Sequence, residues 1–332
     1  MLGDLVAALR PALGILHKRD IQTAAMHLGR YVPQRTTGSP ILLGDDCAAI
    51  PDGTDYLLLA AEGLWPPLVA AEPWFAGWCA VLVNVSDIYA MGGRPIAVVD
   101  ALWSQSEATA EALWQGMLAA SKTFNVPIVG GHTNCHSPYA ALSVAILGRA
   151  HHLITSFAAQ PGDALVLVTN LDGRSHPDYP FWDAATMADP ARLQRHLDLL
   201  PQVAELGLCQ AGKDVSMGGI IGTTLMLLET SGCGAVLDVE TIPCPAEVPL
   251  EKWLLSFPSY GFLLSVPVKN LNSLQALFHQ EKLVCEPIGM VTGDRTLTLK
   301  TKTETDVFWD FTQSALTGFS HPKGSAPTSR QN

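Results

Sequence analysis

Charged side chains are scarce in this chain, and basic ones are the scarcer kind. Only 15% of the 332 residues are charged, and 31 Asp and Glu outnumber 20 Lys and Arg, which gives a formal net charge of -11 at pH 7. A nucleic-acid surface needs clustered Lys and Arg to displace phosphate counterions. The composition therefore argues against a nucleic-acid partner, and it predicts that any phosphate ligand arrives with a divalent cation.

Long apolar runs and a cysteine framework are also missing. No run of eighteen apolar residues lacks a charge or Pro, and the start, MLGDLVAALRP, has an acid before any base, so we expect neither a membrane span nor a secretory signal. Seven cysteines, an odd number without regular spacing, fit a reducing cytoplasm better than a disulfide scaffold. With 48% hydrophobic residues, the chain can bury a large core and is long enough for two domains.

One apolar helix carries two polar side chains in its middle. Apolar residues recur at spacings of three and four from Trp74 to Tyr89, and a glycine pair and a proline then end the helix. Asn84 and Asp87 are three residues apart and share one stripe of this helix. A buried carboxylate needs a cation, a cluster of donors or a water-filled cleft in front of it. The alternative is a structural Asp87 that caps a neighbouring loop.

Three other segments place acidic or small polar residues where a strand or a glycine pair meets a helix. They are GDDCAAI at 44–50, GGHTN at 130–134 and KDVSMGGI at 213–220. Together with NVSDIYAMGG they resemble the AIR synthase (PurM)-like superfamily, which includes thiamine-monophosphate kinase, selenophosphate synthetase and the hydrogenase-maturation carbamoyl dehydratase. The resemblance covers about residues 40–300 and indicates a divergent AIR synthase-related branch.

The first of these segments carries two adjacent carboxylates, Asp45 and Asp46, after a strand that we expect at 41–43. Adjacent carboxylates repel each other, so they persist where a cation such as Mg²⁺ compensates them. The alternative is that Asp45 caps a turn and Asp46 is solvated. In the thiamine-phosphate kinases a GDDCA or GDDAA motif stands after the first strand, and its Asp binds Mg²⁺.

The next expected strand, 56–61, ends at Glu62, a further candidate metal ligand. Family members usually have Ser/Thr-Thr-Asp here, whereas this chain has Ala60 and Ala61 in place of the two hydroxyl residues. The following stretch, GLWPPLVAAEPW, lacks the His that helps to bind thiamine phosphate in the kinase. These departures count against a thiamine-phosphate kinase.

A strand over 126–132 runs into a glycine pair. Gly130 and Gly131 let the backbone approach a phosphate closely, and the N–H groups of such a turn form an anion cradle, with Thr133 beside it. Relatives have an acidic metal ligand where this chain has His132, whose imidazole suits softer metals or proton transfer. A separate hypothesis is a zinc site, although its spacing matches no closed zinc motif, made of Cys47, His132, Cys135 and His136.

Two further residues are candidate nucleotide contacts. Trp114 lies in a helix expected at 107–124 and is a core residue on pattern alone, but by resemblance LWQGM sits where the kinases have an aromatic residue close to adenine. KDVSMGGI opens an apolar helix, whose N-terminus favours anions. Asp214 and Ser216 match the family's D-[IV]-S pattern as metal ligand and phosphate contact, whereas Met217 replaces a second Asp.

The resemblance implies a PurM-like two-domain fold of the α/β (α+β) class; periodicity alone gives only alternating strands and helices. We expect an N-terminal helical segment at 1–35, an ATP- and Mg²⁺-binding domain at 36–150, an α/β sandwich domain at 158–305 and a disordered tail at 318–332. By analogy the first domain closes a mixed β-barrel with its mate in a homodimer. An insertion at 171–190 is either a substrate lid or a surface loop, and PIGMVTGDRTLTL is a terminal strand pair.

The superfamily's chemistry implies ATP- and Mg²⁺-dependent activation of a heteroatom in a small-molecule substrate. The following residues are then expected to hold Mg²⁺ on the phosphates: Asp45, Asp87 and Asp214, with Asp46 and Glu62 assisting. Nucleotide contacts are expected from Asn84, Trp114, Gly130, Gly131, Thr133 and Ser216. His132 is either a proton carrier or a mere occupant of the vacated ligand position. The alternative, which draws on the family residues that the chain has lost, is a non-catalytic nucleotide-binding or scaffold subunit of a multi-enzyme pathway.

Overall fold

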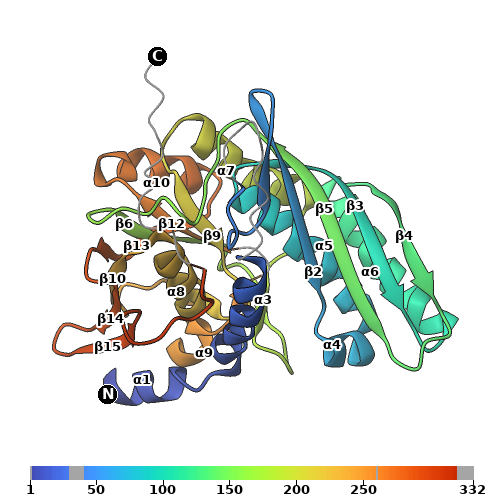
Figure 1. The fold of residues 1–332 in the computed structure, drawn as a ribbon, viewed down its shortest axis with the longest axis horizontal. Helices are drawn as coiled ribbons and strands as arrows, with labels where there is room; N and C mark the ends of the chain where they lie inside the picture. The colour runs from blue at the N-terminus through green and yellow to red at the C-terminus, as the bar shows by residue number, and fades with distance from the viewer. Residues whose placement is uncertain (1, 30–40, 259–260, 320–332) are drawn as a thin grey trace.

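The computed structural model describes residues 2–29, 41–258 and 261–319. Two α/β domains lie side by side, the N-terminal one around a five-stranded sheet and the C-terminal one around a seven-stranded sheet (Figure 1). The predicted α/β (α+β) class with two domains is confirmed. Within the described residues no helix has the length and hydrophobicity that crossing a membrane requires.

The N-terminal sheet has the strand order β1-β2-β5-β3-β4 and is covered by helices on one face. Its strands are β1 (Ala48–Asp52), β2 (Asp55–Gly63), β3 (Arg94–Trp103), β4 (Ile128–Asn134) and β5 (Ala141–Ala150). The covering helices are α4 (Pro66–Ala71), α5 (Pro73–Ala90) and α6 (Glu107–Phe124). All neighbouring strands are antiparallel except β3 and β4, so β4 forms a parallel edge.

Helices α5 and α6 form as the sequence predicts, and they pack unusually closely. A Cβ at Gly116 of α6 would lie 1.9 Å from the carbonyl oxygen of Trp74, and one at Gly77 of α5 would lie 2.1 Å from that of Leu113. The glycine in LWQGM is therefore required by the contact between the two helices. Ser106 caps the N-terminus of α6: its hydroxyl accepts from the Thr109 N–H.

The C-terminal sheet has the order β15-β14-β10-β13-β6-β12-β9. Its strands are β6 (Ala164–Thr169), β9 (Ala211–Asp214), β10 (Gly234–Asp238), β12 (Gly261–Val266), β13 (Val284–Thr292), β14 (Thr296–Lys300) and β15 (Thr305–Asp310). Helices α7 (Pro190–Glu205) and α10 (Leu271–Gln280) pack together against the sheet, and α8 (Gly219–Ser231) and α9 (Leu250–Leu254) form a second packed pair.

The expected terminal strand pair is wrong in its pairing. Strands β13 and β14 both form, but β10 lies between them, antiparallel to β13 and parallel to β14, and β15 follows. The turn that connects β13 to β14 crosses the start of β10. Gly234 leaves room for this turn, because a Cβ at Gly234 would lie 2.4 Å from Asp294 Oδ1. The alternation of apolar and polar residues predicted the two strands, but it did not predict that β10 pairs with both of them.

The helical N-terminal segment packs on the C-terminal domain. It comprises α1 (Leu2–Leu9), α2 (Leu13–Leu16), the 3₁₀ turn η1 (His17–Asp20) and α3 (Ile21–Leu28). Helix α2 contacts the turn before α8 so closely that a Cβ at Gly14 would lie 2.4 Å from the Met217 carbonyl oxygen. The Gln22 amide donates to the Ala315 and Leu316 carbonyl oxygens, 3.0 Å away in each case. The N-terminal segment and the residues after β15 therefore meet near α8.

Three local predictions need correction or fall outside the described residues. No strand forms at 41–43; β1 starts at Ala48, because Gly44 adopts φ +110° and turns the next residues toward the other domain. The insertion at 171–190 contains β7 (Arg174–Ser175) and β8 (Phe181–Asp183), which form a small sheet with β11 (Phe257–Pro258). Of the expected tail, residues 318–319 lie in the described part, whereas residues 320–332, and residues 30–35 of the expected N-terminal segment, lie outside it.

Candidate active site between the domains

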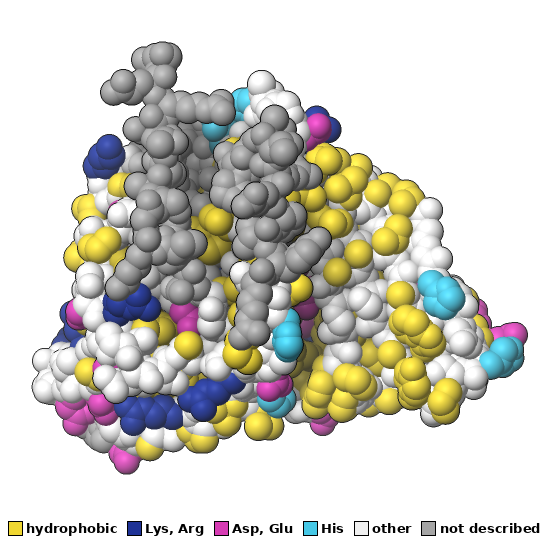
Figure 2. Space-filling model, in the orientation of Figure 1, with side chains coloured by type: hydrophobic (Ala, Val, Ile, Leu, Met, Phe, Trp, Pro, Cys, Tyr) yellow, Lys and Arg dark blue, Asp and Glu magenta, His cyan; other side chains and the backbone are white. Residues whose placement is uncertain are grey.

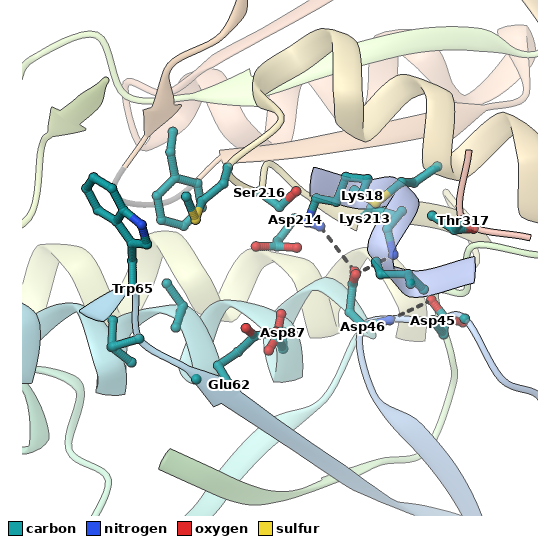
Figure 3. A pocket seen from close by; sticks show the side chains of 18 of the residues that line it. Lys18, Asp45, Asp46, Glu62, Trp65, Asp87, Lys213, Asp214, Ser216 and Thr317 are labelled. Carbon is teal, nitrogen blue, oxygen red and sulfur yellow. Dashed lines mark hydrogen bonds and ion pairs between the residues drawn. The ribbon is translucent and has the colours of Figure 1, made fainter. Parts of the chain in front are cut away.

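A cavity of about 260 Å³ lies where the two domains and the N-terminal segment meet (Figure 3). Its wall is built from the loop before β1, the end of β2, helix α5, the β9–α8 turn, η1 and the residues after β15. The polar side chains that line it are Lys18, Asp45, Asp46, Glu62, Asp87, Lys213, Asp214, Ser216, Thr230 and Thr317. Segments far apart in the sequence thus converge on one polar surface.

Three carboxylates from three different elements form the centre of this surface. Asp46 precedes β1, Asp87 lies near the end of α5, and Asp214 ends β9. One oxygen from each lies within 4.8 Å of the others. Asp87 and Asp214 are both buried, with 6% of their surface exposed. We call Asp46, Asp87 and Asp214 the carboxylate triad.

Asp45 and Glu62, the two other expected metal ligands, lie beside the triad. The Asp45 carboxylate accepts from the Thr155 hydroxyl and from the Ser156 N–H, 3.0 Å from Oδ1, in the connection between the domains. Asp45 therefore anchors that connection, and the central position expected for it belongs to Asp46. Glu62, the residue before the last of β2, points toward Asp87 (Figure 3).

Lys213 is the main site residue that the sequence did not reveal. Its side chain is buried, and its ammonium forms an ion pair with Asp46, whose other oxygen accepts from the Asp214 N–H at 3.2 Å. Burial alone disfavours the ammonium, but Asp46 and Asp45 together raise the Lys213 pKa above its ordinary value. The sequence feature that could have indicated this role is the position of Lys213 directly before Asp214 in the family motif.

One buried lysine does not balance the acids around it. Burial, and then the charge of Asp214, raises the pKa of Asp87 well above its ordinary value; burial, and then the charge of Asp46, raises that of Asp214 to about 8. Among the described residues, Asp87 Oδ2 and Ser216 Oγ are buried and have no hydrogen-bond partner. Unpaired buried oxygens of this kind suit a hard divalent cation, and the donor set fits Mg²⁺.

The other expected nucleotide contacts lie away from the cavity. Asn84 is fully buried in α5, where its amide donates to the Ala80 carbonyl oxygen at 2.8 Å. Trp114 is half-buried against the core of the N-terminal domain. Neither side chain is part of the cavity lining. The helical pattern predicted a core position for Trp114, and this prediction agrees with the structure better than the adenine contact expected from the kinases.

The glycine pair forms no turn, which corrects the expected anion cradle. Gly130, Gly131, His132 and Thr133 all lie within β4, extended and exposed on the edge of the sheet. Hydrogen bonding to β3 holds this backbone straight, with Gly131 paired to Asp100. The His132 ring lies 5.7 Å from the Trp103 ring, so this side chain faces the strand neighbour and not the triad.

The zinc hypothesis also fails in the described part of the chain. The groups of side chains there that could hold a metal are the carboxylate triad and a second group of Glu72, His176 and Asp178. Neither contains Cys47, His132, Cys135 or His136. None of the seven cysteines forms a disulfide.

Two family models together match most of the chain. The model of the AIR synthase related protein N-terminal domain matches residues 44–150, and that of the corresponding C-terminal domain matches residues 160–302. A Synechocystis protein, sll0787, is 62% identical over 322 residues, which are 96% of this chain and 99% of that one. The selenide, water dikinase of Colwellia psychrerythraea is 26% identical over 74% of this chain and 82% of its own length.

Solved structures share the fold at low identity. T. maritima PurL complexed with ATP superposes with a TM-score of 0.72 at 17% identity; the match covers 89% of this chain but 51% of PurL, so this chain spans about half of that protein. AaThiL complexed with AMPPCP and TMP superposes with a TM-score of 0.64 at 21% identity over 87% of this chain and 96% of AaThiL. With both domain models matched in order and the two-domain fold shared, this chain belongs to the AIR synthase related protein family, with a PurM-like fold.

Proposed function

We propose that the protein is an ATP- and Mg²⁺-dependent enzyme that phosphorylates, or activates for dehydration or ring closure, a heteroatom of a small-molecule substrate. The observation that carries the proposal is the buried carboxylate triad, with the unpartnered Asp87 Oδ2, on the wall of a cavity between the domains. Names of similar proteins support it: PurL was solved with ATP and AaThiL with AMPPCP, and a related protein is a dikinase.

The phosphates would occupy the side of the cavity that carries Lys18 and Lys213. Lys18 lines the cavity, and its positive charge opposes the rise in the pKa values of Glu62 and Asp214 that burial causes. The unpartnered Ser216 hydroxyl lies in the turn before the 13-residue helix α8, whose N-terminal N–H groups favour negative charge. Together these groups offer donors and positive charge to a triphosphate.

The proposed reaction needs little covalent participation by the protein. The substrate heteroatom forms a bond to the γ-phosphorus while the bond from that phosphorus to the β–γ bridging oxygen breaks; ADP leaves with the electron pair, and the substrate proton passes to solvent. Mg²⁺ held by Asp46, Asp87 and Asp214 would neutralise the charge that develops on the phosphate oxygens. Lys213 orients Asp46 for that task through their ion pair.

The assay that tests the proposal is ADP formation by the purified protein in ATP and Mg²⁺, with and without candidate small-molecule substrates. We expect turnover that EDTA abolishes and that a suitable substrate increases. Saturable ATP binding without any ADP formation, under every condition and with every partner protein tried, would favour a nucleotide-binding or scaffold subunit instead.

We also propose that the protein is a homodimer that pairs the open faces of two N-terminal sheets. Helices cover one face of this sheet, and hydrophobic side chains gather on the surface of the domain (Figures 1 and 2). Leu59 of β2, Ile96 and Val99 of β3 and Val129 of β4 are each between 42% and 63% exposed. Exposed apolar side chains on several strands of one sheet favour association with a second sheet.

A charge on this face is expected to separate the subunits. In Val99→Asp each subunit would bury an unpaired carboxylate, so we expect a monomer at concentrations where the wild type is a dimer. Analytical ultracentrifugation measures the change. Val268→Asp, at a valine of the C-terminal domain that is 56% exposed where Val99 is 42% exposed, is the control and should remain dimeric. A wild type that sediments as a monomer at all concentrations contradicts the proposal.

A further inference from the structure

The two sides of the cavity differ in chemistry. Figure 3 shows Lys213 and Thr317 at one side, Asp87 and Asp214 in the middle, and Trp65 at the opposite side. The remaining lining residues include several large side chains without charge, namely Leu64, Leu68, Phe181, Met217 and Phe257. Asp87 and Asp214 therefore lie between a charged region, in which Lys213 pairs with Asp46, and a region with aromatic rings.

Three chain segments supply these rings and hold them together. β8 and β11 pair with Phe181 opposite Phe257, and their ring centroids lie 6.1 Å apart at 68°. The Phe257 N–H also donates to the Pro180 carbonyl oxygen at 2.9 Å. Trp65, which precedes α4, meets the edge of Tyr179 at 5.6 Å and 88°. We call Trp65, Phe181 and Phe257 the aromatic wall.

Contacts behind the wall fix the insertion at 171–190 to the N-terminal domain. The His176 ring stacks on Phe75 with centroids 5.2 Å apart and lies 5.0 Å from Tyr179. Its Nδ1 accepts from the Asp178 N–H at 3.2 Å, so Nε2 carries the proton and donates to the Glu72 carboxylate at 3.2 Å. His176 thus joins the Asp178 backbone in the insertion to Glu72, directly before α5, and this contact positions the wall across the domain boundary.

Part of this region is open to a ligand. Trp65 is 41% exposed and Met217 is 43% exposed, although both line a cavity. Flat aromatic faces and a polarisable thioether favour another flat ring over a saturated group of similar size, because ring stacking adds to the burial of area. A ring held here would place its substituent toward Asp87 and Asp214 in the middle of the cavity.

We propose that the aromatic wall binds a planar aromatic or heteroaromatic ring of the substrate and thereby selects it. This inference rests on the proposed function, since it takes the ligand of the wall to be the group that receives or loses the phosphoryl moiety. It assigns the insertion at 171–190 a role in substrate binding, through Phe181 and the support of Tyr179 and His176.

Binding of two small probes with the same carbon skeleton, one with a flat aromatic ring and one with a saturated ring, tests the inference. Benzyl alcohol and cyclohexylmethanol are titrated into the full-length protein, and binding is followed by saturation-transfer NMR. We expect benzyl alcohol to bind about five-fold more tightly than cyclohexylmethanol to the wild type. Trp65→Leu should abolish this preference and Trp65→Phe should retain it. Trp74→Leu is the matched control, since Trp74 is also 41% exposed but lies outside the cavity, and it should keep the wild-type preference.

Equal binding of the two probes to the wild type overturns the inference. A Trp65→Leu variant that unfolds at the wild-type temperature and still prefers benzyl alcohol overturns it as well. Should Trp65→Leu fail to fold, Phe257→Leu replaces it with the same expectation. No step of this experiment requires ATP or turnover. A missing ring preference and a missing ATPase activity are therefore separate results, the first against the aromatic wall and the second against the proposed function.

Discussion

Lys213→Met is expected to destabilise the metal-free protein by about 3–5 kcal/mol, because it leaves a buried carboxylate without its cationic partner. The ammonium of Lys213 pairs with Asp46, and the side chains of both residues are about 5% exposed, so solvent cannot replace the lost charge. The carboxylates of Asp87 and Asp214 nearby add repulsion. Urea unfolding in EDTA measures the loss as a change in the free energy of unfolding.

A double-mutant cycle distinguishes this charge effect from loss of packing. Asp46→Asn in the Lys213→Met background removes the uncompensated charge, so we expect it to restore a large part of the lost stability. Mg²⁺ should also stabilise Lys213→Met more than it stabilises the wild type, since the ion supplies the missing positive charge. Equal stabilities of Lys213→Met and the wild type in EDTA would show that the ion pair is not part of the fold in solution.

Asp87→Asn is expected to lower Mg²⁺-dependent ADP formation by about a thousandfold while it stabilises the metal-free protein by about 1 kcal/mol. The two effects have one cause. Asp87 Oδ2 is buried without a hydrogen-bond partner, and burial together with Asp214 already raises the Asp87 pKa well above its ordinary value. An amide removes that unfavourable charge, but it is a much weaker ligand for Mg²⁺.

A conservative change elsewhere in the same domain serves as the control. Asp100→Asn alters a half-buried Asp of β3 that is outside the cavity, so ADP formation should not change. ADP formation rates and unfolding midpoints in EDTA are measured for both variants. Full activity in Asp87→Asn would remove the carboxylate triad from any role in nucleotide chemistry.

Local sequence pattern predicted the elements that carry the site. The apolar spacing from Trp74 to Tyr89 gave helix α5 with Asp87 buried inside it, and the motif KDVSMGGI gave the turn before α8. These features depend on residues a few positions apart, so they can be read without a tertiary structure. Long-range pairing could not be read in this way. Strand β10 lies between β13 and β14 because of contacts that adjacent residues do not encode.

The errors at the site come from side chains whose partners are remote in sequence. Asp45 and Asp46 are neighbours with the same chemistry, yet Thr155 engages the first and Lys213 the second. The glycine pair at 130–131 reads as a turn, but pairing with β3 keeps it extended. Lys18 and Thr317 reach the cavity from opposite ends of the chain, a convergence that only the fold reveals.

Thermal unfolding with Mg²⁺ alone, ATP alone and both ligands, on the wild type and on Asp87→Ala, tests most directly whether the carboxylate triad holds a metal on ATP. A ligand at about a hundred times its dissociation constant adds roughly 2.7 kcal/mol to the stability of the folded state, enough to raise the midpoint by several degrees. We predict for the wild type a shift that requires both ligands, and for Asp87→Ala no such shift. An equal shift in the variant, or none in the wild type with any combination, would contradict the assignment of the site.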